Sequence, residues 1–581
     1  MKVLRAGLMP ASLYAAETHG ISDTALHRMR SMAAQVGGAG GQGRSLLLTM
    51  LLVQDVGMGP AVATTVKVVS AWASLVWESK LDRTDLRLAV HAAILRQGNA
   101  KSPWATVNGP AGALVATLDR IGWVVIDESR WQDDQGLVLD LELICPRALA
   151  KLAERAVERW TTRQLAARHA ELAHLEVGIT MKPLRRLVRK EGVDWGPRHR
   201  GLLEALVVGA TPCQASLVGW GLAESDVCRA CAQGPGTHSH RHWECDCSRP
   251  FREAYGFRGY VQRLTRSPGL NPTVAGLMSR CLLPDPRGHA DLGLQRLDMV
   301  WEVEPTGGCF EGRLCVDASG ACPTDPLLSR VGWGAVQVGG RFGDQIVGAV
   351  RGVLCHPLQE VGMGEILVVA EMLRFCVPPI TIVTDYQNLV DGFYLLGPEG
   401  TTSSGSKYAD IWRMFWLAVL DFGRDLVAVV KVPSHKTLEA FMALPGALVA
   451  DWHGNRQADL AAKRGAAMHG DFGELKRKVV AAELLVDTIA KYVGRLHVHL
   501  TECKLVDCQQ RRDEGEQDLA EEQAAEAEPP PPPSPPGPEV GARPMPPGMQ
   551  LEVVMPGAAA HQADEVHVSH HMRRLHMTIC L

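Results

Sequence analysis

Residues 314–320 read LCVDASG and residues 381–389 read TIVTDYQNL. Each stretch is an apolar run rich in β-branched residues that ends in an aspartate, Asp317 in the first and Asp385 in the second. Runs of this composition are typical of buried β-strands. The two aspartates are therefore expected at strand ends, where side chains from neighbouring strands can meet.

Two more acidic residues lie inside apolar patterns with helical spacing. They are Glu365 in MGEILVVAEML (363–373) and Asp459 in GNRQADLAA (454–462). Carboxylates at strand ends and on facing helices can converge on one point. Such a cluster is unfavourable by itself, because like charges repel and raise one another's pKa, so it indicates bound divalent cations. The chemistry that uses this arrangement is two-metal phosphodiester hydrolysis.

The order of these motifs between about residues 311 and 470 resembles a type 1 ribonuclease H domain. Further agreement comes from the Gly-x-Gly in VGWGAVQV (331–338) and from the Asn-x-x-Ala-Asp-x-x-Ala around Asp459. His435, in VVKVPSHKT, stands where that family keeps a mobile loop histidine between its last strand and its last helix. The resemblance implies an α/β fold for 306–475, with a mixed five-stranded sheet and flanking helices.

By the same resemblance, Asp317 and Asp385 would contact both or one of two Mg²⁺ ions, and Glu365 and Asp459 would complete the cluster. Mn²⁺ could replace Mg²⁺. His435 would assist proton movement or product release. The positions that would touch the substrate backbone are Ser319 and Gln387.

Two features depart from the family. Ala318 stands where the family often has glycine after the first aspartate. Residues 397–423 offer one helix and a polar Gly/Ser loop in place of the basic helical protrusion that many members use to hold the hybrid. The grip on substrate would then have to come from elsewhere in the chain.

A cysteine and histidine cluster, VCRACAQGPGTHSHRHWECDC, occupies residues 227–247. Cys228 and Cys231 have the Cys-x-x-Cys spacing that lets two thiolates bind one tetrahedral metal, and a histidine with Cys245 could complete a Cys3His site for structural Zn²⁺. The spacing is similar to the zinc-binding module of many non-LTR retrotransposons, and that resemblance selects His240. The alternatives that stay open are His238 or His242 for the histidine and Cys247 for Cys245.

The N-terminal residues carry a related resemblance. The segment LRAGLMPASLYAAETHGIS is similar to the one that follows the polymerase core in non-LTR reverse transcriptases, with Tyr14, Glu17 and Gly20 filling its Tyr-x-x-Glu-x-x-Gly pattern. The sequence contains no Phe/Tyr-x-Asp-Asp turn, and its Asp133-Asp134 pair follows RWQ. If the protein derives from a retroelement, the polymerase core is not in this chain.

The remaining regions follow from composition. The chain of 581 residues is expected to hold several units: 1–50 as a reverse transcriptase remnant, 51–205 as a helical connection, 206–250 as the zinc module, 251–305 as a linker, 306–475 as the ribonuclease H-like domain, 476–509 as a terminal helix and 510–581 as a disordered acidic and proline-rich tail. Any partner of the tail is unknown.

The net charge of −4 conceals a strongly basic stretch at 181–200. Its candidates for contacting a phosphate backbone are Arg185, Arg186, Arg189 and Lys190. Fifteen cysteines without a framework pattern, and no leader segment, favour an intracellular location in the nucleus or cytoplasm. The longest apolar stretch, SLLLTMLLV, is too short to span a membrane.

The expected function is endonucleolytic cleavage of the RNA strand of RNA–DNA hybrids. Two alternatives remain: a catalytically inactive retroelement fragment that binds nucleic acid, or a domesticated interaction protein that recruits partners through its tail.

Overall fold

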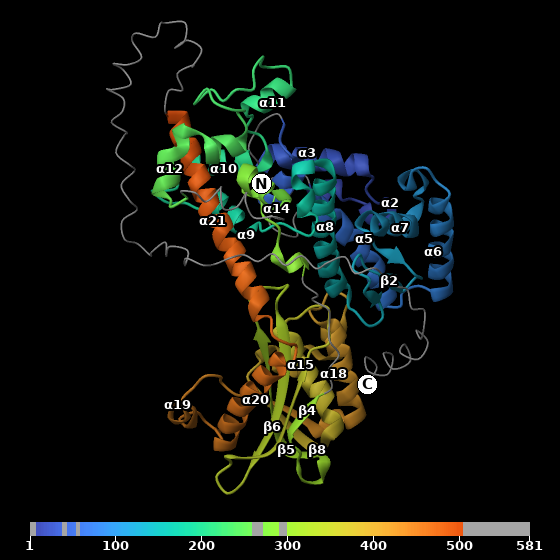
Figure 1. Cartoon of the computed structure of the whole chain (residues 1–581). Coiled ribbons are helices and arrows are strands. Elements are labelled where there is room, and N and C mark those ends of the chain that lie inside the picture. Colours follow the sequence, from blue (N-terminus) through green and yellow to red (C-terminus); the bar gives the residue numbers. More distant parts are fainter. Residues whose placement is uncertain are drawn as a thin grey trace, which may run out of the picture.

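The computed structural model describes residues 7, 9–37, 43–53, 59–257, 271–289 and 299–502. The expected tail at 510–581 and parts of the expected linker, 258–270 and 290–298, lie outside the described residues. The described chain combines a unit built on a six-stranded mixed sheet with a larger, mainly helical part (Figure 1).

The strands of the large sheet lie in the order β4-β7-β6-β5-β8-β9. Their bounds are β4 Val300–Val303, β5 Phe310–Ala321, β6 Arg330–Gly339, β7 Gln345–Val353, β8 Cys376–Thr384 and β9 Val427–Lys431. Strands β5, β8 and β9 are parallel, and the other neighbours are antiparallel. The expected number of five strands was wrong, because β4 adds a sixth at the edge. That strand has four residues, pairs only with β7 and has a register shift, so it leaves almost no alternating pattern in the sequence.

Helices cover both faces of this sheet. On one face lies α15 (Val361–Met372), which also packs on α18 (Ala409–Phe422), and on the other lies α20 (Val449–Ala467). Glycines in β6 let α20 approach closely: a Cβ at Gly332 would lie 1.8 Å from the backbone nitrogen of Ala466. The Gly-x-Gly of this strand therefore has a packing role, because both glycines point at the same helix. Three short helices complete the unit: α16 Gln387–Asp391, α17 Gly397–Thr402 and α19 Leu438–Met442.

The N-terminal part is mainly helical. Its elements are α1 Met9–Ser12, α2 Ala16–His19, α3 Asp23–Gly37, α4 Leu46–Val53, α5 Pro60–Trp77, α6 Arg83–Gly98, α7 Gly109–Ile121, β1 Val124–Val125, β2 Arg130–Gln132, β3 Val138–Asp140 and α8 Pro146–Arg168. By length and composition α5 could cross a membrane, but 56% of it is buried inside the protein, which makes this weak evidence.

The N-terminal motif has a structural use. Glu17 forms an ion pair with Lys67, at 3.0 Å between Oε2 and Nζ. Gly20 has a φ of 63°, and a Cβ there would lie 2.6 Å from the ring of Trp104. Only glycine fits this position, whereas the side chain of Tyr14 is 86% exposed.

The Asp133-Asp134 pair lies in the turn between β2 and β3. The Asp133 carboxylate accepts hydrogen bonds from two backbone N–H groups of that turn. Asp134 forms ion pairs with Arg159 and Arg163 of α8. Both aspartates thus have structural partners.

A third group of helices surrounds the long helix α21 (Gly473–Glu502), which leaves the sheet unit and runs into the helical part (Figure 1). The helices that pack on α21 or share an apolar cluster with it are α9 Lys182–Arg189, α10 Pro197–Val208, α12 Arg249–Ala254 and α14 Asn271–Arg280. The short helix α11 Gln214–Gly219 follows α10 in the chain. One apolar cluster, called here the α21 core, joins buried residues between Leu47 and Leu282 to one face of α21. The residues from α21 are Leu485, Val486, Ile489, Ala490, Tyr492, Val493, Leu496 and Leu500.

The sheet unit and the N-terminal helices also share a core. The Trp77 indole donates a hydrogen bond to the carbonyl of Thr402 at 2.9 Å, and the guanidinium of Arg413 stacks on the Trp77 ring at 3.2 Å. The expectation of one helix in 397–423 was wrong, because the Gly/Thr-rich start of this segment also forms a helix, α17, and both α17 and α18 contact α5 through these residues.

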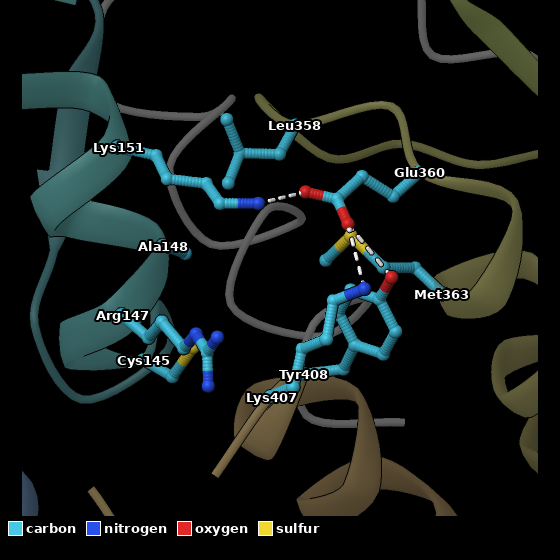
Figure 2. Close-up of a pocket in the computed structure, with 9 residues that line it drawn as sticks. All are labelled: Cys145, Arg147, Ala148, Lys151, Leu358, Glu360, Met363, Lys407 and Tyr408. Atoms are coloured by element: carbon cyan, nitrogen blue, oxygen red, sulfur yellow. Dashed lines mark hydrogen bonds and ion pairs between the residues drawn. The ribbon is translucent and has the colours of Figure 1, made fainter. Parts of the chain in front are cut away.

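A small pocket marks the same interface, between α8 and the sheet unit (Figure 2). Glu360 is one of its lining residues and forms an ion pair with Lys151 of α8. Tyr408 donates a hydrogen bond to Glu360 at 2.7 Å, and Lys407 lies 3.2 Å from the same carboxylate. Burial opposes ionisation, but these contacts outweigh it and hold the pKa of Glu360 at about 2. The carboxylate stays charged and links α8 to the residue that directly precedes α15.

Candidate metal centres and nucleic-acid surface

Strand register brings Asp317 and Asp385 together. In the parallel pair β5–β8, Cys315 lies opposite Val383. Asp317 and Asp385 each follow two residues later, so they occupy the same level and point to the same face of the sheet. Asp317 is buried and Asp385 is half-buried.

Glu365 completes this group from the first turns of α15. A Cβ at Gly364 would lie 2.8 Å from the Cβ of Ala318, so the helix can rest directly on β5 beside Asp317. One carboxylate oxygen from each of Asp317, Glu365 and Asp385 lies within 4.8 Å of the other two. Glu365 is only 4% exposed, and its Oε2 has no hydrogen-bond partner among the described residues. A buried oxygen without a donor suits a cation ligand.

The three carboxyls are called here the acidic group, and in it burial and neighbouring charges oppose the ionisation of Asp317 and Glu365. Burial, followed by the charges of Asp385 and Asp459, raises the pKa of Asp317 to about 7. Burial and the charges of Asp317 and Asp385 raise the pKa of Glu365 well above its usual range. A divalent cation would reverse this effect, because it favours the charged form of every carboxylate around it.

Asp459 acts on the acidic group from α20. It is half-buried, and its Oδ2 lies 2.7 Å from Nζ of Lys463, one helical turn later. Among the described residues, the set of mutually close ligand atoms comprises Asp317, Glu365 and Asp385, so Asp459 contributes through its charge in this conformation.

The other expected site residues lie outside the acidic group. His435 is exposed, in a turn between β9 and α19, with a φ of 56°. Ser319 is half-buried on β5, two residues beyond Asp317. Gln387 is exposed at the start of α16, where its amide donates to Asp391 at 2.7 Å. Asp317 was expected at a strand end but lies inside β5, because pairing with β6 extends that strand to Ala321, whereas Asp385 directly follows β8 as expected. Ser319 and Gln387 each lie two residues after one of these aspartates, and His435 is on a loop that would have to move.

The cysteine-rich segment forms a compact group of four ligand atoms. Cys228, Cys231, His240 and Cys245 each place one atom within 4.8 Å of the others, with 3.2 Å between Sγ of Cys231 and Nε2 of His240. Three sulfurs and one nitrogen are a donor set that suits tetrahedral Zn²⁺. The thiol of Cys247 instead donates to the carbonyl of Ala230 at 3.0 Å.

The two other histidines of this segment belong to a second group. His238 and His242 lie close to His497 of α21, with one ring nitrogen of each within 4.8 Å of the others. Burial lowers the pKa of His238 to about 4 and that of His497 to about 3, so the rings are neutral. Sequence reasoning missed His497, because 255 residues separate it from His242 and its surroundings, LHVHL, look like an ordinary helix face.

The basic stretch is partly used for internal packing. Arg185 donates to the carbonyl of Leu51 and to Glu158, and Arg186 forms an ion pair with Asp487 of α21 at 2.7 Å. Trp195 is 2% exposed and is part of the α21 core. Its ring therefore cannot stack on a base in this conformation. Arg189 and Lys190 are exposed at the end of α9.

Comparison with models of known protein families gives no match for this chain, and comparison with curated proteins gives no significant match. A functional assignment therefore depends on the chemistry of the acidic group, the cysteine group and the histidine group.

Proposed function

We propose that this protein is a metal-dependent endonuclease that cleaves the RNA strand of RNA–DNA hybrids, and that it derives from a retroelement. The observation that carries the proposal is the acidic group: Asp317, Glu365 and Asp385 meet at the end of a parallel strand pair, with Asp459 close enough to shift the pKa of Asp317. Carboxylates held together in this way have little use without cations, because their mutual repulsion opposes folding.

The donor set fits Mg²⁺. Its ligands would be carboxylate oxygens, which hard divalent cations prefer, and the unpartnered Oε2 of Glu365 is available. Mg²⁺ bound there would lower the pKa of a water molecule and offset negative charge on a phosphate.

The chain's own residues would position the substrate around this point. Ser319 and Gln387 each lie two residues beyond an aspartate of the acidic group, so their polar side chains could hold the sugar–phosphate backbone beside that group. His435 would carry a proton to or from the scissile site, since its exposed turn can approach bound nucleic acid. The carboxylate of Asp459, on α20, would attract a cation to its side of the acidic group.

The cysteine group would bind a structural Zn²⁺, because its four protein ligands fill a tetrahedral site. These ligands are Cys228, Cys231, His240 and Cys245. The basic helix α9 packs on the long helix α21, through Arg186 and Asp487, so this part of the chain would offer a surface for the nucleic acid backbone outside the sheet unit.

The test is cleavage of an end-labelled RNA–DNA hybrid by the full-length protein in Mg²⁺. Asp385→Asn removes a ligand and should reduce cleavage at least about a hundredfold. The matched control is Asp344→Asn, an exposed aspartate in the β6–β7 turn, which should cleave like the parent. Duplex DNA and duplex RNA serve as competing substrates.

Equal cleavage by the parent and Asp385→Asn would contradict the assignment of the centre. Hybrid binding without cleavage, in Mg²⁺ and in Mn²⁺, would support the inactive nucleic-acid-binding alternative. A protein that neither binds nor cleaves the hybrid would favour the third alternative, an interaction protein.

A further inference from the structure

A second cluster of metal-binding side chains joins the cysteine-rich segment to α21. His238 and His242 come from residues 227–247, and His497 comes from the last turns of α21. Nε2 of His242 lies 2.9 Å from Nε2 of His497, and the ring centroids of His238 and His242 are 5.8 Å apart. His242 is fully buried and His497 is 4% exposed.

Backbone carbonyls set the tautomers of two of these rings. Nδ1 of His242 lies 3.0 Å from the carbonyl of Met278, and Nε2 of His238 lies 2.9 Å from the carbonyl of Thr211. A carbonyl oxygen only accepts hydrogen bonds, so each of these nitrogens must carry a proton. In a neutral ring the other nitrogen then has a free lone pair. These lone pairs belong to Nε2 of His242 and Nδ1 of His238.

One of these lone pairs has no partner. Nδ1 of His238 is buried and has no hydrogen-bond partner among the described residues. A hydrogen bond between His242 and His497 would satisfy Nε2 of His242, but it would leave His238 unpaired. A buried acceptor without a donor is unfavourable by about 1–3 kcal/mol. A cation shared by all three rings would satisfy each lone pair at once.

We propose that His238, His242 and His497 bind a transition-metal ion in addition to the one expected at the cysteine group. This ion would be Zn²⁺ or another metal that prefers imidazole ligands, and it would fasten α21 to the cysteine-rich segment. Tetrahedral Zn²⁺ with Zn–N bonds of about 2.0–2.1 Å needs ligand nitrogens about 3.3 Å apart. The 2.9 Å between His242 and His497 reaches that value with a small rotation of either ring. The carbonyls of Met278 and Thr211 would orient two ligands, as hydrogen-bond partners of metal-bound histidines commonly do. A water molecule would fill the fourth position.

The test measures zinc in full-length protein purified without chelator. The parent should carry about two equivalents, one for each group, and His497→Gln should carry about one fewer. The matched control is His499→Gln, whose ring packs on Phe251 at 4.5 Å between centroids, and this variant should keep the parental content. Other histidines in the chain are common to all variants and cancel in the difference.

Cobalt substitution distinguishes the two sites. In the parent, Co²⁺ should give sulfur charge-transfer bands from the cysteine group and separate ligand-field bands from the histidine group. Cys228→Ser should weaken the first set, and His497→Gln should remove only the second. His238→Gln, at a less buried position, tests the same site if His497→Gln fails to fold. Equal zinc content and equal cobalt spectra in the parent and a folded histidine variant would overturn the proposal.

Discussion

Replacing Asp317 with asparagine should make the metal-free protein more stable at about pH 8, although Asp317 lies at the centre of the acidic group. The pKa of this carboxyl is about 7 in the folded protein, against 3.8 as its ordinary value. The folded state therefore binds the proton more tightly than the unfolded state. The protonated Asp317 carboxyl therefore contributes stability that is fully present below pH 3.8 and is lost as the pH rises through about 7.

The size of the effect follows from the pKa. The rise from 3.8 to about 7 is about three units, and each unit corresponds to about 1.4 kcal/mol, so at most about 4 kcal/mol is lost above neutral pH. Neighbouring carboxyls can bind protons in place of Asp317 and so reduce this loss. We therefore expect Asp317→Asn to raise the free energy of unfolding by about 2–4 kcal/mol. For a unit of this size, that raises the melting midpoint by about 4–16 °C. At about pH 5 the gain should shrink by more than half.

The assay is thermal unfolding followed by circular dichroism, in chelator and in Mg²⁺, for the parent, Asp317→Asn and Asp344→Asn. In chelator only Asp317→Asn should melt higher than the parent. Mg²⁺ at about a hundred times its dissociation constant should stabilise the parent by about 2.7 kcal/mol but have much less effect on Asp317→Asn. The reasoning is refuted if Asp317→Asn melts below the parent in chelator at about pH 8, or if it gains as much from Mg²⁺.

Three further outcomes can be measured. Cys231→Ser should release about one equivalent of zinc while hybrid cleavage persists, as metal analysis beside the cleavage assay would show; parental zinc content would count against the cysteine site. Neutralising Arg189 and Lys190 with glutamine should lower the slope of log affinity against log salt by up to about one unit for each phosphate that is no longer neutralised, with cleavage at saturating hybrid unchanged; an unaltered slope would exclude them as phosphate ligands. Gly332→Ala should destabilise the sheet unit by about 2–5 kcal/mol in denaturant unfolding, because its Cβ would overlap the backbone of α20, whereas Gly405→Ala, with open space around it, should have little effect.

Sequence patterns predict much of the sheet unit, because its buried strands carry long apolar runs. TIVT (381–384) becomes the end of β8, with Asp385 directly after it, and VGWGAVQV becomes most of β6. The edge strand β4 could not be predicted, since four residues paired on one side carry little periodic signal. The Gly-x-Gly of β6 can be seen in the sequence, but only the structure shows that α20 packs against both glycines.

The candidate sites divide in a similar way. The acidic residues could be selected because strands and helices place them by local periodicity. The partners of Arg186 and His242 could not, because Asp487 and His497 lie 301 and 255 residues further along the chain. A basic residue in an ion pair and one that faces solvent have the same local sequence. Likewise, His238, His240 and His242 alternate within five residues, and only the packing of α21 assigns them to different groups.

The α21 core has a consequence for biosynthesis. Its first part, up to Leu282, leaves the ribosome well before Leu485 and the rest of the α21 face are made. The intervening stretch is roughly 200 residues, which takes about 10–40 s to synthesise at about 5–20 residues per second. Throughout that interval the apolar surface that α21 later covers stays open to water and to other nascent chains. Chaperone binding to this surface during translation is therefore an expected step in making the protein, and the sheet unit can begin to fold before the helices that precede it have closed their core.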